Sequence, residues 1–169
     1  MKTTHVPSGF HPVQHERIIE ELVHDAYKLR GKLPEPTICP SCGAVFRHGR
    51  WQWLDVASLE APSEHLCPAC LRMQDHFPAG YVFIAGPFAV SHRNEILQLI
   101  HNEEAHQKAE HPLKRVMAIK SEEGGVLVTT TDIHLARGIG EALHRAYQGK
   151  LEFHYNPEQW LLRVRWERA

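Results

Sequence analysis

The chain has 169 residues, which is enough for one domain of ordinary size or two small ones, each with a limited apolar core. Its 19 Lys and Arg residues against 20 Asp and Glu residues give a formal net charge of -1, which excludes a polycation that captures nucleic acid by long-range attraction. No stretch reaches the roughly 18 apolar residues of a membrane span, so we expect a cytoplasmic protein without membrane association.

The first half of the chain predicts a helix followed by a small cysteine-bearing module. Apolar residues recur at helical spacing through residues 14–30, and Gly31 follows as a stop. Residues 43–56 predict a hairpin that bends at His48 and Gly49, and residues 68–77 predict a short helix. With a Cys-x-x-Cys unit before the hairpin and another before the second helix, residues 1–79 predict an N-terminal helix followed by a zinc ribbon or treble-clef module.

Two Cys-x-x-Cys units contain all the cysteines of the chain: Cys39, Cys42, Cys67 and Cys70. In a reducing compartment such pairs are typical of a metal site rather than of disulfides. Four thiolates suit one tetrahedral zinc ion, and four protein ligands leave no position for a catalytic water. We therefore expect one structural zinc ion, with redox sensing by the thiolates as the alternative.

Residues 80–169 predict a second part with the order strand, helix, strand, strand, helix, strand, strand. Ser91 is the expected cap of a helix over 91–109, and Thr131 or Asp132 of a helix over 132–147. A loop over 156–159 would join the last two strands and pair Tyr155 with Trp160 and Glu152 with Arg163. This order predicts an α+β fold, a split βαβ (ferredoxin-like) domain with an added strand.

Three groups of cationic side chains are candidates for RNA contact. Arg47, His48 and Arg50 lie at the expected hairpin tip, close to Trp51 and Trp53, which either stack on bases or cover the small core. The other candidates are Arg137, about one turn inside the second helix, and Arg163 and Arg165, which share the outward face of the last strand. The alternatives are simple capping at the helix entrance and a solvated sheet face.

The sequence gives little sign of catalysis. It contains no phosphate-binding loop and no nucleophile elbow, and no cysteine lies outside the metal set. Asp132, His134 and Arg137 are the residues that an enzyme would use. We expect a protein without catalytic activity and without a small-molecule substrate.

The run "EHPLKRVMAIKSEEGGVLVTTTDIHLARGIGEALHRAYQGKLEFHY", preceded by "CPSCG" and "CPAC", resembles a bacterial family of uncharacterised small zinc-knuckle proteins. That family in turn resembles, distantly, the archaeal and eukaryotic adaptor family for export of the large ribosomal subunit. The resemblance implies binding to the ribosome or its RNA, with Cys39, Cys42, Cys67 and Cys70 as metal ligands. It does not imply export, because the long carboxy-terminal extension of the eukaryotic proteins is not present.

We therefore expect a non-catalytic zinc-binding factor that associates with the ribosome or rRNA, in large-subunit binding, assembly, quality control or hibernation. The alternative is a zinc-stapled adaptor between proteins, which the near-neutral charge favours. An uncharacterised enzyme is the third class.

Overall fold

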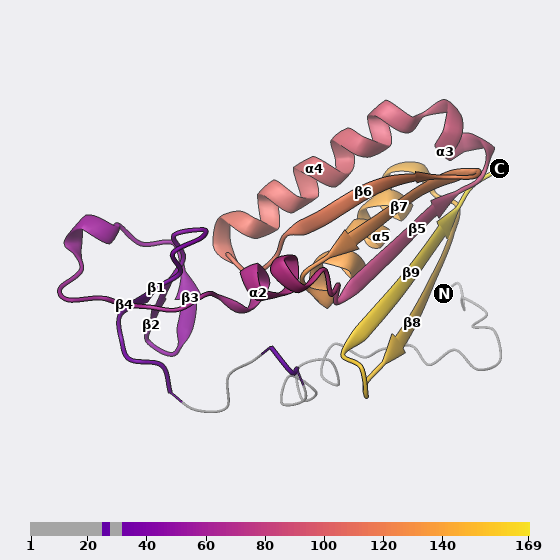
Figure 1. Ribbon diagram of the computed structural model, residues 1–169. Helices are drawn as coiled ribbons and strands as arrows, with labels where there is room; N and C mark the ends of the chain where they lie inside the picture. Colours follow the sequence, from indigo (N-terminus) through magenta and orange to yellow (C-terminus); the bar gives the residue numbers. More distant parts are fainter. Residues whose placement is uncertain (1–24, 28–31) are drawn as a thin grey trace, which may run out of the picture.

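The computed structural model describes residues 25–27 and 32–169, which form two mixed β-sheets with helices (Figure 1). The small sheet has the strand order β3-β2-β1-β4, and the large sheet has the order β6-β7-β5-β9-β8. Most of the predicted helix over residues 14–30 lies outside the described residues, and within it Asp25–Tyr27 form a turn. No helix in the described parts of the chain has the length and apolar character that crossing a bilayer requires.

The small sheet contains the predicted hairpin. Strand β2 (Val45–Arg47) pairs antiparallel with β3 (Arg50–Gln52), and β1 (Thr37–Ile38) pairs with β2 and, in parallel, with β4 (Ser63–Glu64). His48 and Gly49 both have positive φ angles, 54° and 76°, as a two-residue hairpin turn of the I′ type requires. After the short helix η2 (Val56–Ser58), the chain returns through β4 to helix α2 (Pro68–Asp75).

The large sheet carries the second part of the chain. Its elements are β5 (Gly80–Ala85), α3 (Pro87–Ser91), α4 (Arg93–Glu110), β6 (Val116–Glu122), β7 (Gly125–Thr130), α5 (Ile133–Tyr147), β8 (Lys150–Asn156) and β9 (Leu161–Glu167). Strand β7 lies between β5 and β6 and is antiparallel to both, so the first half forms a split βαβ unit. Strand β9 lies on the other side of β5 and parallel to it, with β8 at the edge. The added strand therefore lies inside the sheet, and the complete ferredoxin-like arrangement is not confirmed.

The apolar core lies between the large sheet and its helices. Val82, Ile84 and Val164 point from β5 and β9 toward this core, where Ile100 of α4 and Ile139 of α5 are also fully buried. Figure 1 shows α5 behind the sheet, so the sheet has one face covered by helices and one face toward the viewer. A separate small core surrounds the cysteines and includes Ala44 and Ala69.

The predicted cap Ser91 is wrong. Residues 87–91 form the short helix α3, and α4 begins after His92, whose side chain makes no cap hydrogen bond. The hydroxyl of Ser91 donates instead to backbone carbonyls one turn earlier, those of Pro87 and Phe88. Serine before an apolar helix is typical of a cap, but Ser91 ends α3 rather than beginning α4.

The predicted register of the last hairpin is also wrong, by two residues. Tyr155 pairs with Leu162, and Glu152 pairs with Arg165, because the loop covers 157–160 and includes Trp160. Trp160 has a φ angle of 48°, a conformation that tryptophan rarely adopts, and its side chain is buried. A shift of two keeps every side chain on the same face, so the pattern of apolar and charged residues fits both registers.

Two glycines in α5 give a testable contrast. A Cβ atom on Gly140 would lie 2.6 Å from Cγ1 of Val164 in the core, whereas one on Gly138 would meet the flexible ends of Gln107 and Glu103. We expect Gly140→Ala to lower the free energy of unfolding by about 1–3 kcal/mol through overpacking. Gly138→Ala is the control and should be neutral or stabilising by up to about 1 kcal/mol, because alanine favours the helix. Thermal and urea unfolding measure both; equal effects would contradict this packing.

Candidate metal centre and its surroundings

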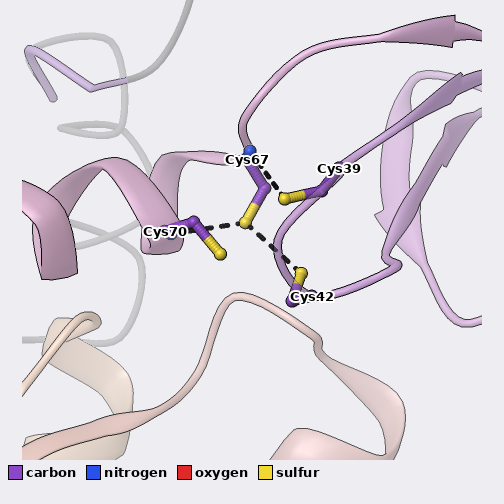
Figure 2. A group of neighbouring side chains, drawn as sticks. All are labelled: Cys39, Cys42, Cys67 and Cys70. Atoms are coloured by element: carbon purple, nitrogen blue, oxygen red, sulfur yellow. Dashed lines mark hydrogen bonds between the residues drawn. The ribbon is translucent and has the colours of Figure 1, made fainter.

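The four cysteine sulfurs meet between the hairpin and α2 (Figure 2). Cys39 follows β1, Cys67 is the N-cap of α2, and Cys70 lies in the first turn of that helix. All four Sγ atoms lie within 4.8 Å of one another, and those of Cys42 and Cys67 are 3.8 Å apart. The cysteines are not disulfide-bonded, and three of them are buried. This constellation is a site that can hold a metal ion.

Backbone N–H groups point at these sulfurs, as thiolates require. Cys67 N–H donates to Sγ of Cys39, and Cys70 N–H donates to Sγ of Cys67, each at 3.4 Å. Ala44 N–H donates to Sγ of Cys42 at 3.5 Å, across a turn that Gly43 closes with a φ angle of 80°. Hydrogen bonds to a charged acceptor are stronger than neutral ones, so the local backbone stabilises the deprotonated cysteines. The N-terminus of α2 adds its partial positive charge.

Arg115 reaches the cluster from the second part of the chain, just before β6. Its guanidinium donates to Sγ of Cys67 at 3.0 Å, to Sγ of Cys70 at 3.3 Å and to Sγ of Cys42 at 3.4 Å. The side chain is only 8% exposed, and its Nε–H donates to the carbonyl of Pro112. Burial alone would lower the pKa of Arg115, but the hydrogen bond to Cys70 and the charges of the other cysteines raise it. The guanidinium is therefore a cationic partner of the thiolates.

In the absence of a metal ion, the pKa values of Cys42 and Cys67 shift in opposite directions. The hydrogen bond with Cys67 lowers the pKa of Cys42, with help from Ala44 N–H and the charge of Arg115. The same hydrogen bond raises the pKa of Cys67, and so does burial. A metal ion must displace the proton that Cys67 keeps, so its binding weakens as the pH falls.

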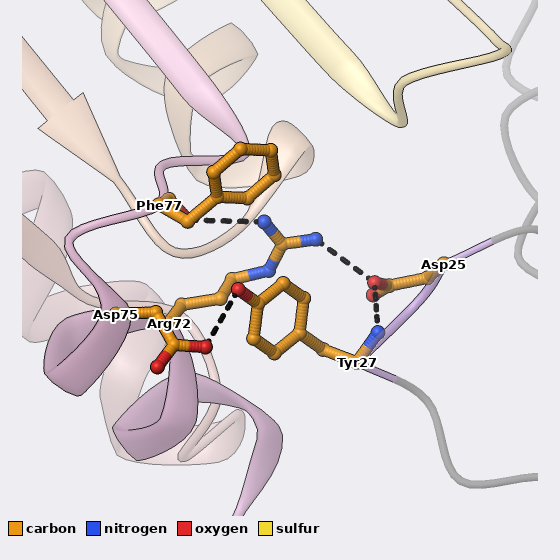
Figure 3. A network of polar contacts seen from close by, with 5 residues as sticks. All are labelled: Asp25, Tyr27, Arg72, Asp75 and Phe77. Carbon is orange, nitrogen blue, oxygen red and sulfur yellow. Dashed lines mark hydrogen bonds and ion pairs between the residues drawn. The ribbon is translucent and has the colours of Figure 1, made fainter.

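A second arginine fixes the described piece of chain before the module (Figure 3). Arg72 of α2 is 2% exposed and forms an ion pair of 2.8 Å with Asp25. Its guanidinium lies 4.4 Å from the centre of the Tyr27 ring, and the hydroxyl of Tyr27 donates to Asp75 at 2.9 Å. The carbonyl of Phe77 accepts from Arg72 at 3.1 Å. Asp25–Tyr27 is thereby held against α2.

The structure places the predicted RNA-contacting residues in three separate positions. Arg47, His48 and Arg50 are exposed at the tip of the β2–β3 hairpin. Arg137 lies on α5, where it forms an ion pair of 2.8 Å with Glu141, so it belongs to the helical layer. Two further arginines, Arg163 and Arg165, are exposed on the opposite face of the large sheet.

A cleft of about 990 Å³ lies between the hairpin and the second part of the chain. His48, Arg50 and Trp51 line it from the hairpin, and Lys114 lines it from the segment that leads to Arg115. Asp132 also lines the cleft and caps α5 by accepting a hydrogen bond from Leu135 N–H at 2.9 Å. Asp132, rather than Thr131, is therefore the cap. The hydroxyl of Thr131 instead donates to the carbonyl of Leu113.

No protein-family model, curated protein or solved structure matches this chain. The resemblance to the family of the large-subunit export adaptor stays a prediction from the sequence motifs.

Sequence reasoning missed the two arginines that are buried in the described part of the chain. Arg115 is separated from Cys70 by 45 positions and stands beside Lys114 in a segment that reads as surface charge. Arg72 lies on a short helix whose other polar residues, Gln74 and Asp75, are exposed. Arginine is almost never fully buried unless it is paired, and neither partner is visible from spacing along the chain.

We expect Arg115→Met to lower the free energy of unfolding by about 3–5 kcal/mol, because it leaves the buried thiolates without their cation. Arg115→Lys should lose less, since an ammonium keeps the charge but cannot reproduce the planar fork of donors. Lys114→Met is the matched control and should change stability by no more than about 0.5 kcal/mol. Chemical unfolding measures all three, with metal content assayed in parallel. An Arg115→Met protein as stable as the Lys114→Met protein would contradict this role.

Proposed function

We propose that the protein is a non-catalytic zinc-binding factor that associates with the ribosome or rRNA, in which the metal holds a cationic hairpin in place. Zinc fits the donor set because it binds four thiolates in a tetrahedron with metal–sulfur bonds of about 2.3 Å. Such a tetrahedron has edges of about 3.8 Å, and Cys42 and Cys67 have their sulfurs 3.8 Å apart. All four positions of a tetrahedral ion are then filled by protein, which supports a structural role.

The observation that carries the RNA part of the proposal is the pairing at the hairpin tip. Arg47 and Arg50 stand directly opposite each other in the β2–β3 register. Like charges in this position destabilise a hairpin. Neither arginine forms an ion pair within the described part of the chain. Glu35 is close, but its carboxylate accepts from Gly49 N–H. A phosphate group would relieve the repulsion between the two guanidinium groups.

The overall charge of -1 is compatible with such local contacts. It provides no long-range attraction, but affinity for RNA depends on the phosphates that are contacted directly. Trp51 is half-buried against the cysteine core and also lines the cleft, so an aromatic face accompanies the cations. The ribosome as the particular RNA rests on the resemblance described above.

A protein–protein adaptor is the second candidate, and the composition of the cleft favours it. Lys32 and Arg50 line the cleft together with Glu35 and Glu110, so both signs of charge are present. A mixed lining suits a polypeptide with charges of both signs better than a phosphate backbone. The two candidates differ in the response of binding to salt and to ribonuclease.

We expect one zinc ion per chain, measured by elemental analysis of the purified protein. Cys67→Ser should lose the metal and unfold the module over residues 32–79, because structural zinc contributes about 10–16 kcal/mol to the folding of such modules. The large sheet has its own core and should retain its amide protection in hydrogen exchange. Ser41→Ala, an exposed position between two ligands, is the control and should keep the zinc. Folded protein with little metal and with its cysteines oxidised to disulfides would refute a structural zinc site.

We expect the protein to co-sediment with ribosomal subunits at low salt in a sucrose gradient. The double variant Arg47→Glu plus Arg50→Glu should lose this binding and keep its zinc. Because each phosphate contact contributes about 0.7–0.9 to the slope of log affinity against log salt, a variant with only Arg50→Gln should reduce the slope by about that amount.

The matched control for the ribosome experiment is Lys108→Glu plus Arg145→Glu, which makes the same change in net charge on the helices α4 and α5 of the second part. It should sediment as the unmodified protein does. If the unmodified protein stays at the top of the gradient at low salt, the ribosome proposal fails and the adaptor candidate replaces it.

A further inference from the structure

The face of the large sheet opposite α5 carries an aromatic and cationic surface that the proposed function does not use. In Figure 1 this face is turned toward the viewer. Because side chains alternate along a strand, Tyr81 and Phe83 of β5 point to this face while Val82 and Ile84 enter the core. Within the described residues, the core helices α4 and α5 cover only the other face.

The two rings are half-buried and nearly parallel. Their centres are 6.4 Å apart and their planes differ by 12°. Both belong to the middle strand of the sheet, which has β7 on one side and β9 on the other. Aromatic side chains on the middle strands of an open sheet are one of the ways in which proteins stack the bases of single-stranded RNA.

Cations flank these rings in register. Arg163 is paired with Tyr81 and Arg165 with Phe83 in the β5–β9 ladder. The guanidinium of Arg163 lies 6.0 Å from the centre of the Tyr81 ring, and Arg163 forms no ion pair in the described part of the chain. Exposed Lys120 of β6 stands in the same row as Phe83, on its other side, two strands away.

Charge is not spread evenly over this face. The row across Tyr81 contains Arg163 and His154 and no carboxylate. Acidic residues begin in the next row with Glu152, which stands opposite Arg165, and the last row contains Glu122, Glu167 and Lys150. Lys150 forms an ion pair with Glu152, and Arg165 forms one of 3.6 Å with Glu167. The end of the sheet at Tyr81 is therefore the end that attracts phosphate, and the opposite end repels it.

We propose that this sheet face, which no helix covers within the described residues, binds single-stranded RNA, with Tyr81 and Phe83 stacking on bases and Arg163 and Arg165 contacting the phosphates. The inference rests on the proposed function for the class of partner, and it adds that the RNA is unpaired where it meets the sheet. A purely apolar partner would not explain why Arg163 and Arg165 of β9 stand beside the two rings. Rings beside cations match the combination that sequence-tolerant single-strand binding requires.

The test uses full-length, zinc-loaded protein and a fluorescently labelled ten-nucleotide oligouridine, with binding followed by anisotropy at low salt. Tyr81→Ala and Phe83→Ala should each weaken binding about 5- to 150-fold, the loss expected for one base–aromatic stack. Tyr81→Phe keeps the ring and should restore binding. Phe77→Ala removes an exposed aromatic ring outside the sheet and is the control, with no change expected. Arg163→Gln should reduce the salt slope by about 0.7, the contribution of one contact to a single strand.

Each other outcome is decisive. If the protein binds ribosomes but not the oligonucleotide, or binds it equally well with Tyr81→Ala, the sheet inference is overturned while the proposed function stands. Failure to bind either ribosomes or the oligonucleotide overturns both. Equal binding of a duplex RNA would show electrostatic attraction without stacking and would overturn the inference too. If Tyr81→Ala lowers the melting temperature by several degrees and Arg163→Gln leaves the salt slope unchanged, the face is occupied by other parts of the chain and the inference fails.

Discussion

The contact between Arg115 and the cysteine sulfurs is the interaction on which the arrangement of the two parts depends. Four thiolates around a divalent ion leave a net negative charge of two units, which is costly in a buried place unless a cation stands beside it. An arginine does not lose its proton, and its planar fork reaches Cys42, Cys67 and Cys70 together. Metal binding in one part and the packing of the other part therefore stabilise each other.

This coupling extends into the segment that leads to Arg115. Leu113 packs against the cysteine core, and its carbonyl accepts from the hydroxyl of Thr131, while the carbonyl of Arg115 accepts from Thr131 N–H. Thr131 directly precedes Asp132, the cap of α5. The thiolate cluster, the start of β6 and the start of α5 thus form one connected unit. Because these elements and the hairpin line the same cleft, the position of the hairpin tip over that cleft depends on the cluster.

A structural feature could be predicted from the sequence where it depends on residues that are close together along the chain. The cluster of four cysteines and the bend at His48 were predictable, because the Cys-x-x-Cys spacing and a two-residue turn leave their pattern in neighbouring residues. The register of the last hairpin was not, since a period of two cannot distinguish a shift of two, and nothing marked Trp160 for a left-handed conformation. Arg115 was missed for the opposite reason. The fold brings it to cysteines that are far away along the chain, and an arginine next to a lysine is typical of a solvent-exposed segment.

The same coupling bears on the RNA binding that we propose for a nearly neutral chain. The hairpin tip and the open sheet face belong to different parts, and each offers only a few cations and aromatic rings. Two weak sites on one rigid body bind a single long partner far better than either site alone, but only where their spacing matches that of the partner. Arg115 helps to fix that spacing by holding the hairpin module against the sheet domain. Loss of the metal would leave the cations in place along the chain and remove the geometry that the proposed binding of one RNA by both surfaces requires.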